Sequence, residues 1–376
     1  MTDLAPVRTV TSPKRFVIGS DLLMKLHEHM LDLGNHALFI CDEFIVERIH
    51  DEVLPALKSH QLNGVAVKFN YECTQQEIDR LSGLSKTNHC NVIVGIGGGK
   101  TLDSAKATAN QLKLPVVIIP TLAATDAPCT ALAVLYKENG EFDRYLFLPQ
   151  NPDLVIADLA IITAAPKRFF SAGIGDALAT YFEARACYQS DGVNLVLKRP
   201  SRTGLGLAKM CYEILCENAA NAIEAVNQHL ITPALEQTIE ATIYLSGVGA
   251  ESGGLAASHA VSNGLTAVPD LHHSQHGEKV GFGLMTQLVL ENAPDNEWQQ
   301  VLSIMFNAQL PMTMQALGMK EFDETQWRQV AKIACDKNDT MGNMPMRVSE
   351  DDVYYAMLAA DAIGKRYLAQ HAAQPI

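Results

Sequence analysis

Hydrophobic and polar positions follow different patterns in the two halves of the chain. Up to about residue 160, short runs rich in β-branched residues are separated by polar–apolar stretches of helical length, such as residues 43–60. Alternating strands and helices are typical of a parallel sheet covered by helices on both faces. The runs predicted as its strands are 15–19, 36–41, 64–69, 91–97 and 115–121.

Residues 130–148 break this alternation. Two strand-like runs flank Asn139 and Gly140, and an Asn-Gly pair favours a tight connection between antiparallel strands, so a β-hairpin is predicted here. Residues 152–166 then contribute one further strand and an exit from the sheet.

After Pro166 the sequence is rich in Ala, Leu and Glu and follows helical spacing. We therefore expect a boundary near residues 160–170, with an α/β domain at 1–165 and an all-α domain at 166–376. The predicted helices are 172–189, 202–230, 233–261, 277–293 and 349–371.

The composition supports two domains in a soluble protein. A chain of 376 residues is long for a single core, and 48% hydrophobic with 19% charged residues is ordinary for globular proteins. The net charge of −13 argues against nucleic acid and against an anionic membrane surface as partners. The eight cysteines form no C-x-x-C motif and no apolar run could span a membrane, so we expect a cytoplasmic protein with reduced thiols.

Residues 92–110 predict a strand, a glycine turn and a helix. The turn, Gly97–Gly99, leaves room for a phosphate at the helix N-terminus. Neither common nucleotide motif fits, because the first glycine of a P-loop would fall on Val94 and the last glycine of the dinucleotide fingerprint on Lys100. A tight turn without a ligand is the alternative, but three successive glycines cost backbone entropy and favour phosphate binding.

Asp42 follows the second predicted strand. A carboxylate there could accept hydrogen bonds from a ribose diol and would repel a 2′-phosphate, which favours NAD over NADP. An acid after a strand is also a common helix N-cap, so this position alone leaves both roles open.

Two places in the helical half carry single candidate metal ligands. Asp176 is expected in the first turn of a helix that starts after Gly175, where an acid also complements the helix dipole. His259 is expected inside an Ala-rich helix and shares a face with Leu255, as a hydrogen-bonded core histidine also would. Neither residue identifies a metal site on its own.

A third place, residues 271–283, holds His272, His273 and His276. The i, i+4 spacing of His272 and His276 could place two imidazoles on one metal if the segment were helical. The next helix is expected to start at about Glu278, which puts the histidines on a loop with His276 beside the helix start. Local spacing leaves open whether they form a site together, serve one completed elsewhere, or are surface residues.

Several segments together resemble the glycerol dehydrogenases of the metal-dependent type III alcohol dehydrogenase family. The resemblance covers nearly the full chain. It implies a Rossmann-like α/β domain with a parallel sheet, an all-α domain, a dehydroquinate synthase-like architecture and an active site in the cleft between the domains. The segments are GIGGGKTLDSAK (95–106), TDAPCTALAVLY (125–136), NPDLVIAD (151–158), GIGDALATYFEARAC (173–187), YLSGVGAESGGLAASHA (244–260), HGEKVGFG (276–283) and NMP (343–345).

Carried over by matching position, the metal ligands would be Asp176, His259 and His276. Asp126 would contact the substrate, and Asp126 and His259 would be the catalytic residues. Iron-dependent members carry a further histidine where this chain has Thr180, so the chain resembles the zinc-using branch. The residues implied in NAD binding are Asp42, Gly98, Gly99, Lys100, Thr121, Thr130, Leu132 and Tyr136.

The chemistry of this ligand set agrees with the resemblance. Two histidines and one carboxylate leave zinc an open position, as catalytic zinc requires. The same ligands around Fe(II) would form an oxygenase triad, and the nucleotide turn favours a dehydrogenase. Zinc would lower the pKa of a bound alcohol, and the cofactor would accept hydride. The resemblance thus implies NAD-dependent oxidation of glycerol to dihydroxyacetone, and of other vicinal diols, by a homo-oligomer, an octamer in this family.

Two other functions stay open on the sequence. A lyase of the dehydroquinate synthase type also uses NAD and zinc, but it needs basic residues around a phosphorylated substrate, and Lys279 is the one basic residue in the metal segments. A purely structural zinc ion is normally bound by four protein ligands. The three ligands implied here therefore argue against a metal that only stabilises the fold.

The chain departs from the family pattern near the substrate. Loss of an aromatic wall opens space and removes apolar contact, so we expect a roomier or weaker glycerol site that favours other vicinal diols. The departures are Ala250 in place of an aromatic residue, Ser258 and Ser262 in place of Ala and His, Gly281 in place of Ala, and Ala124 in place of Ser.

Overall fold

A computed structural model describes residues 7–372 of the protein. The chain separates into two compact units. A sheet unit comprises residues 11–165 together with 229–231, and a helical unit comprises residues 7–10, 166–228 and 232–372. The chain therefore passes between the units more than once.

The centre of the sheet unit is a six-stranded parallel sheet in the order β1-β8-β5-β4-β2-β3. Its strands lie where the β-branched runs predict them, because a strand covered on both faces is apolar along its whole length. The predicted α/β class with a parallel sheet is confirmed. The strands are β1 (Phe16–Gly19), β2 (His36–Cys41), β3 (Asn63–Lys68), β4 (Val92–Gly97), β5 (Val116–Pro120) and β8 (Leu154–Asp158).

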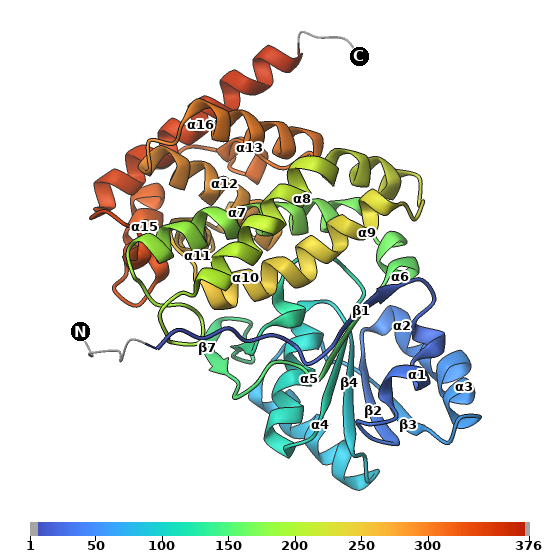
Figure 1. The fold of residues 1–376 in the computed structure, drawn as a ribbon. Helices are drawn as coiled ribbons and strands as arrows, with labels where there is room; N and C mark the ends of the chain where they lie inside the picture. The colour runs from blue at the N-terminus through green and yellow to red at the C-terminus, as the bar shows by residue number, and fades with distance from the viewer. Residues whose placement is uncertain (1–6, 373–376) are drawn as a thin grey trace. The chain divides into compact units, whose positions relative to one another are not determined.

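Helices cover both faces of this sheet (Figure 1). One face carries α5 with α4 beside it, and the other carries α1, α2 and α3 around a core that includes Phe39, Val94 and Ile119. Between α2 and α3 the helix widens into a π-helical turn, Ile49–Val53, just before Pro55, which has no N–H for the regular ladder. The helices are α1 (His27–Met30), α2 (Glu43–Arg48), α3 (Leu54–Lys58), α4 (Gln75–Thr87), α5 (Gly99–Leu112) and α6 (Leu159–Thr163), with short 3₁₀ turns at Leu23–Lys25 and Ala127–Cys129.

The predicted hairpin is present in the sheet unit as β6 (Leu132–Tyr136) and β7 (Phe142–Phe147). The two strands pair antiparallel on either side of the Asn139 and Gly140 turn. Gly140 has a φ of +83°, a conformation that glycine adopts without strain, which explains why the turn ends on this residue.

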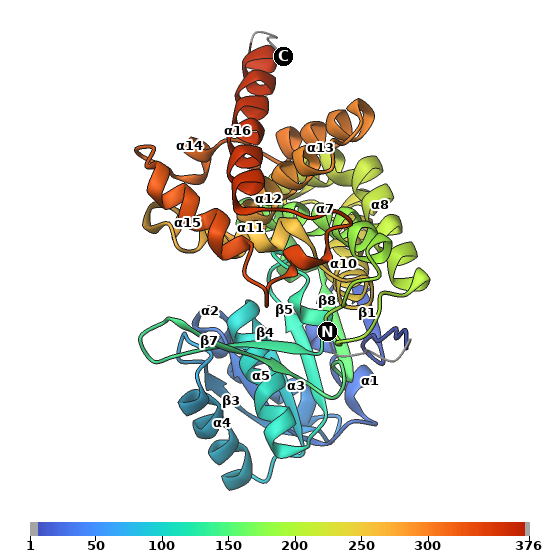
Figure 2. The ribbon, with the colours of Figure 1, turned by 90° about the vertical axis from the view of Figure 1, so that its left-hand side faces the viewer.

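The helical unit is built around α7, which packs against α8, α10 and α12. The long α16 packs against α12 and α15 (Figure 2). The helices are α7 (Lys167–Gln189), α8 (Arg202–Asn227), α9 (Pro233–Glu240), α10 (Ser246–Gly253), α11 (Ala257–Leu265), α12 (His276–Leu290), α13 (Asp295–Asn307), α14 (Met314–Leu317), α15 (Glu324–Ala334) and α16 (Glu350–Ala372). A π-helical segment, Ala241–Leu245, joins α9 to α10, and 3₁₀ turns lie at Pro269–Leu271 and Thr340–Asn343.

Two helix starts beside the candidate ligands differ from expectation. α7 begins at Lys167, not after Gly175, so Asp176 lies well inside the helix rather than in its first turn. Gly175 lies inside α7 without interrupting it, and at this glycine α7 contacts the backbone of α12. α12 begins at His276 and not at about Glu278, so His276 is the first helical residue rather than a loop residue.

The single helix expected over residues 233–261 is also wrong. The chain turns sharply at Gly254, whose φ of +96° suits only glycine, and a new helix starts at Ala257. His259 therefore lies in the first turn of α11, and Leu255 precedes that helix instead of sharing a face with it.

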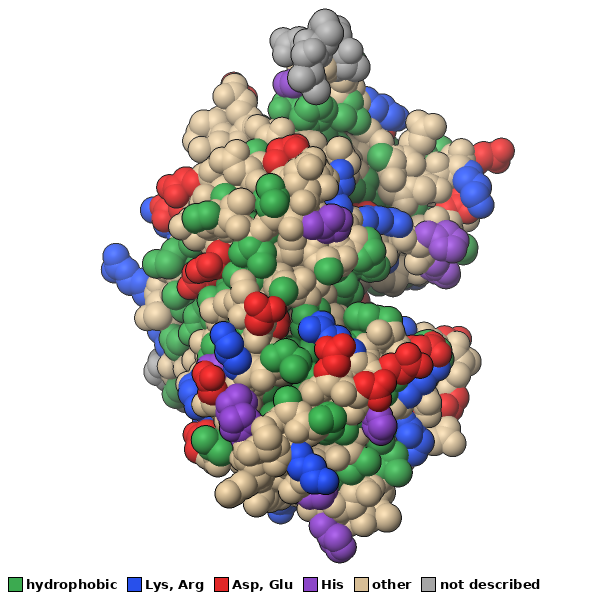
Figure 3. All heavy atoms as spheres, turned by 90° about the vertical axis from the view of Figure 1, so that its right-hand side faces the viewer, with side chains coloured by type: hydrophobic (Ala, Val, Ile, Leu, Met, Phe, Trp, Pro, Cys, Tyr) green, Lys and Arg blue, Asp and Glu red, His purple; other side chains and the backbone are tan. Residues whose placement is uncertain are grey.

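Three further features concern the charges on the surface, the cysteines and the hydrophobicity of the helices. On the face shown in Figure 3, Lys and Arg side chains are scattered among Asp and Glu side chains. All eight cysteines are free thiols. Within residues 7–372, no helix combines the length and the apolar character that a membrane span needs.

Candidate metal centre and nucleotide-binding turn

Asp176, His259 and His276 converge in the helical unit although they come from three different helices. One ligand atom of each side chain can be chosen so that all three atoms lie within 4.8 Å of one another. No other cluster of this kind occurs in the part of the chain that the structure describes. The residues brought together are those that the resemblance implies as metal ligands.

The spacing within this cluster suits a metal ion. Nε2 of His259 and Nε2 of His276 each lie 3.4 Å from Oδ1 of Asp176. Ligand atoms placed about 2.1 Å from a tetrahedral zinc stand about 3.4 Å apart. The Asp176 side chain is 1% exposed and that of His276 is 44% exposed, so the cluster is accessible from one side. The side chains and their spacing therefore fit a divalent cation.

The charges of the cluster are coupled. Burial by itself would raise the pKa of Asp176, but His276 and His259 hold that pKa well below its ordinary value. Burial would likewise lower the pKa of His259, but the carboxylates of Glu183 and Asp176 raise it well above its ordinary value. The two carboxylates therefore favour the charged form of the His259 ring, and binding of a metal at Nε2 requires loss of that proton.

Two glycines beside the ligands allow α7 and α12 to touch. Neither Gly175 nor Gly277 has room for a Cβ, because backbone atoms of the facing helix occupy that space. The contact brings Asp176 and His276 to the same site from two helices.

The same face of α7 carries two more buried polar residues. Thr180 lies one turn after Asp176, at the position where iron-dependent relatives are expected to have a histidine. Its hydroxyl is 2.8 Å from that of Ser246. Glu183 lies two turns after Asp176 and is 2.6 Å from Nδ1 of His259. The sequence analysis missed Glu183, although its spacing of seven residues from Asp176 indicates the same helix face.

The two other histidines of residues 271–283 lie outside the cluster. His272 and His273 are exposed, and Nε2 of His272 is 3.2 Å from the carbonyl oxygen of Thr266. Among the three, His276 alone meets Asp176 and His259.

The glycine turn lies at the carboxyl end of β4, where α5 begins. The β2–β4 register pairs Cys41 with Ile96, which sets Asp42 beside Gly97. Oδ2 of Asp42 accepts a hydrogen bond from the N–H of Gly98 at 2.8 Å, and Oδ1 accepts one from the hydroxyl of Thr101. Asp42 therefore braces the turn itself, and its contact with a ribose stays a prediction.

The turn has the properties that a phosphate site needs. A Cβ on Gly99 would meet no atom within 4 Å, so a ligand can approach the backbone there. The first N–H groups of α5 have no acceptors within their own helix and carry its positive dipole end. The turn therefore fits the pyrophosphate of a dinucleotide at the carboxyl edge of a parallel sheet.

The other residues implied in NAD binding form two small groups around this turn. Lys100 lies 2.7 Å from Glu72 and its ammonium is 4.8 Å from the centre of the Tyr136 ring. Burial, aided by Asp103, raises the pKa of Tyr136 to about 12.

The second group consists of Thr121, Thr130 and Leu132. Thr121 follows β5, and its N–H donates to the carbonyl of Gly97 at 3.1 Å. The carbonyl oxygens of Thr130 and Leu132 both accept from the buried ammonium of Lys106. Contact of any of these residues with NAD remains a prediction.

Asp126 lies in the sheet unit, in the segment that follows β5. It is partly exposed and directly precedes the 3₁₀ turn Ala127–Cys129. A role toward substrate stays a prediction for this residue.

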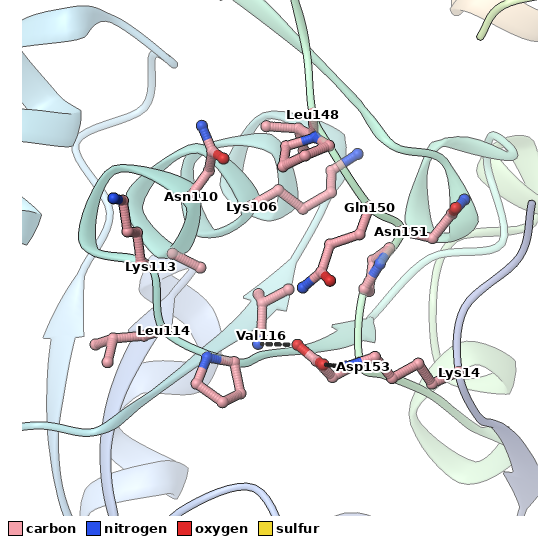
Figure 4. Close-up of a pocket in the computed structure, with 14 residues that line it drawn as sticks. Lys14, Lys106, Asn110, Lys113, Leu114, Val116, Leu148, Gln150, Asn151 and Asp153 are labelled. Carbon is pink, nitrogen blue, oxygen red and sulfur yellow. Dashed lines mark hydrogen bonds and ion pairs between the residues drawn. The ribbon is translucent and has the colours of Figure 1, made fainter.

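A cavity of about 330 Å³ opens in the sheet unit at the amino ends of β5 and β8, the edge opposite the glycine turn (Figure 4). Three of the charged side chains that line it, those of Lys14, Lys106 and Asp153, already have partners. Lys14 is paired with Asp153, whose other oxygen accepts from the N–H of Val116 at 2.9 Å. The Lys106 ammonium is paired with Asp103 at 2.9 Å. Nucleotides bind at the carboxyl ends of such strands, so this cavity is not the nucleotide site.

Four of the five departures from the family pattern are buried in the helical unit, and the fifth, Ala124, is partly exposed in the sheet unit. Ala250 on α10 is 1% exposed, so an aromatic residue there would have to displace its neighbours. The hydroxyls of Ser258 and Ser262 on α11 have no hydrogen-bond partner among residues 7–372. A roomier diol site remains a prediction.

Comparisons with known proteins identify the family of the chain. The sequence profile of the iron-containing alcohol dehydrogenases matches residues 13–159. A glycerol dehydrogenase of Escherichia coli is 49% identical over 96% of this chain and 98% of its own length. One of Pseudomonas putida is 48% identical over 96% of this chain and 99% of its own. The crystal structure of glycerol dehydrogenase from Schizosaccharomyces pombe matches with a TM-score of 0.94 at 30% identity, covering 100% of this chain and 95% of that one.

Identity near one half over almost the entire chain exceeds what a shared fold alone produces. It spans both the unit with the glycine turn and the unit with the cluster of Asp176, His259 and His276. The chain belongs to the glycerol dehydrogenase family, within the iron-containing alcohol dehydrogenases.

Proposed function

We propose that this protein oxidises glycerol to dihydroxyacetone, with NAD as the hydride acceptor and zinc held by Asp176, His259 and His276. The observation that carries the proposal is the meeting of one carboxylate with two imidazoles, each with its Nε2 3.4 Å from that carboxylate, in a chain of this family. In this proposal residues 1–165 form the NAD-binding domain and residues 166–376 the metal-binding domain.

The ligands divide the work at the metal. A zinc ion bound there would act as a Lewis acid and lower the pKa of a bound alcohol. Asp176 contributes a buried negative charge that water screens little. His259 presents Nε2 from a ring whose Nδ1 is held by Glu183. His276 is the ligand with the exposed ring, so a small diol enters from its side.

The glycine turn holds the cofactor. Gly98 and Gly99 let the pyrophosphate reach the first N–H groups of α5, and Lys100 supplies a positive charge close by. Asp42 keeps a negative charge beside the turn, which disfavours the 2′-phosphate of NADP. NAD is therefore the preferred cofactor.

Asp126 positions the substrate in this proposal. A carboxylate accepts hydrogen bonds from alcohol hydroxyls, and a vicinal diol has a second hydroxyl to offer. Asp126 holds that hydroxyl, or passes on the proton of the hydroxyl that is oxidised, directly or through a water molecule.

The lyase alternative has little support around the metal. Lys279 donates to the carbonyl of Ser274 at 3.3 Å, and burial lowers the pKa of its ammonium. It is therefore poorly suited to bind a phosphorylated substrate, which leaves the dehydrogenase as the better fit.

One assay tests the proposed function. NADH absorbance is followed with glycerol and NAD before and after treatment with a chelator, and then after zinc is returned. We expect turnover that the chelator abolishes and zinc restores. Turnover that resists complete metal removal would refute the zinc mechanism. No turnover with any vicinal diol would refute the dehydrogenase and revive the lyase or structural alternatives.

We further propose that the protein works in the cytoplasm as a homo-oligomer, an octamer as the family resemblance implies. Sedimentation of the purified protein measures the assembly, and a stable monomer would contradict it.

A further inference from the structure

Glu183 is a fully buried carboxylate in the centre of the helical unit. It lies on α7, two turns after Asp176, and its side chain is 0% exposed. Burial of an ionised carboxylate is unfavourable unless hydrogen bonds compensate for the lost water. The hydrogen bonds that the Glu183 carboxylate accepts therefore indicate its role.

Both carboxylate oxygens of Glu183 are directed at α11. Oε1 accepts hydrogen bonds from the N–H of Ala256 at 2.8 Å and from the N–H of His259 at 2.9 Å. Oε2 lies 2.6 Å from Nδ1 of the His259 ring. α11 has no capping side chain of its own, so Glu183 caps this helix from α7.

The contact with the ring has a chemical consequence. A carboxylate only accepts hydrogen bonds, so Nδ1 of His259 must carry the proton. In the neutral ring the lone pair then lies on Nε2, the atom that stands 3.4 Å from Asp176. The tautomer that can bind a metal at Nε2 is thus selected at the opposite side of the ring.

We propose that Glu183 is a positioning residue that fixes the tautomer and the orientation of His259 and thereby sets the affinity of the metal centre. The proposal rests on the proposed function, because it takes His259 as a ligand. A helix cap with no role toward the metal would need only the two backbone hydrogen bonds. The two roles can be separated by a substitution that keeps the cap and reverses the ring contact.

Glu183→Gln is that substitution. The amide oxygen can accept from both backbone N–H groups, and the opposite orientation would leave both donors without an acceptor in a buried site. The amide NH₂ must then face Nδ1 and donate to it. His259 is forced to carry its proton on Nε2, where it blocks the metal.

The experiment measures zinc affinity of the metal-free protein by competition with a chromophoric chelator, and thermal unfolding of the same samples. For Glu183→Gln we expect zinc binding weaker by about 10- to 100-fold, the usual effect of losing a partner of a metal-bound histidine. Asp361→Asn is the matched control, because Asp361 is another buried carboxylate of this unit that accepts a backbone N–H, that of Met314 at 2.8 Å. The control should keep wild-type zinc affinity.

The same substitution in a His259→Ala background shows whether Glu183 affects zinc affinity through the imidazole ring or by another route. If Glu183 acts through the ring, Glu183→Gln leaves the residual zinc affinity of His259→Ala unchanged. An equal loss of affinity in both backgrounds would overturn the proposal. If the Glu183→Gln variant fails to fold alone but folds together with His259→Ala, the result supports the contact between residue 183 and the His259 ring. If neither folds, Glu183 is only a structural cap and the proposal is wrong.

Failure of this proposal is distinct from failure of the proposed function. Wild-type protein that binds zinc and oxidises glycerol, with a Glu183→Gln variant of equal zinc affinity, would remove the positioning role alone. Wild-type protein that binds no zinc would remove the metal centre itself.

Discussion

Gly277 faces Gly175 where α12 crosses α7, and a Cβ on Gly175 would lie 2.4 Å from the carbonyl oxygen of Gly277. A Cβ on Gly277 would in turn lie 1.8 Å from the carbonyl oxygen of Ala172. Because the obstructing atoms belong to the backbone, a methyl group can be accommodated only if the helices move apart. Each glycine is adjacent to a proposed metal ligand, so helix packing and ligand spacing are set at the same contact.

Gly277→Ala should therefore lower both stability and zinc affinity. Overpacking of this kind costs about 1–3 kcal/mol of unfolding free energy, and it also separates Asp176 from His276. Denaturant unfolding and zinc titration check the two effects. Gly206→Ala on α8 is the control, since a Cβ there meets nothing within 4 Å. It should stabilise the protein by about 0.5–1 kcal/mol, and equal behaviour of the two variants would contradict the close contact.

His276→Ala and His272→Ala should differ. We expect loss of His276 to weaken zinc binding by more than about 100-fold and to abolish activity, since even the outer partners of ligands are worth 10- to 100-fold. His272 is exposed and contacts only a backbone carbonyl in the described structure, so its loss should change zinc affinity by no more than about twofold. Metal content after dialysis measures both. Zinc retained by the first variant, or lost from the second, would be inconsistent with the assigned cluster.

Gly99→Ala tests the nucleotide turn. The space above this glycine accepts a methyl group, so the variant should fold with wild-type stability or up to about 1 kcal/mol more. The same methyl group occupies the place of a phosphate, and we expect NAD to bind at least about tenfold more weakly because charge-assisted hydrogen bonds are lost. Fluorescence titration with NADH measures the affinity. Unchanged binding in a folded variant would place the cofactor elsewhere.

Asp126→Asn should reduce kcat/KM for glycerol. A hydrogen bond between a hydroxyl and a carboxylate is worth about 1.5–3 kcal/mol, which corresponds to a loss of about 10- to 100-fold. Zinc content and NADH binding serve as controls and should stay at the wild-type level. If kcat/KM for glycerol is unaffected, the assignment of Asp126 has to be abandoned.

Ala250→Phe should change the preference among diols. Because Ala250 is buried, the phenyl ring should also destabilise the protein by about 1–3 kcal/mol through overpacking. Values of kcat/KM for glycerol, 1,2-propanediol and 2,3-butanediol give the preference. Identical profiles in wild type and variant would show that this position does not shape the substrate pocket.

Much of the sheet unit could be predicted from local sequence. Strands such as Val92–Gly97 are apolar throughout because helices cover both faces, and the Asn139 and Gly140 turn marks the hairpin of this unit. The boundaries of the helices that carry the proposed metal ligands could not be predicted equally well. Gly175 resembles a helix break in sequence but is a packing contact, whereas Gly254 does end a helix because of its positive φ.

The ligand set itself came from family resemblance, and local spacing left it open. Glu183 escaped notice because its meaning depends on which segment lies opposite α7. Nothing in residues around Glu183 indicates that His259, 76 positions later, will present its ring there. Long-range pairings of this kind are set by helix packing, which single-sequence patterns do not encode.

The division of the chain into its two units constrains how the gene can be cut. A fragment ending at Ala165 would keep Arg8 but lose Asp191 and Pro200, the residues that hold it in the helical unit. The same fragment would lose His229, whose ring is 3.0 Å from the carbonyl of Thr163 in the sheet unit. A chimera that exchanges one unit for that of a relative therefore needs several coordinated junctions, and a single crossover near residue 165 leaves each half with a foreign piece of the other.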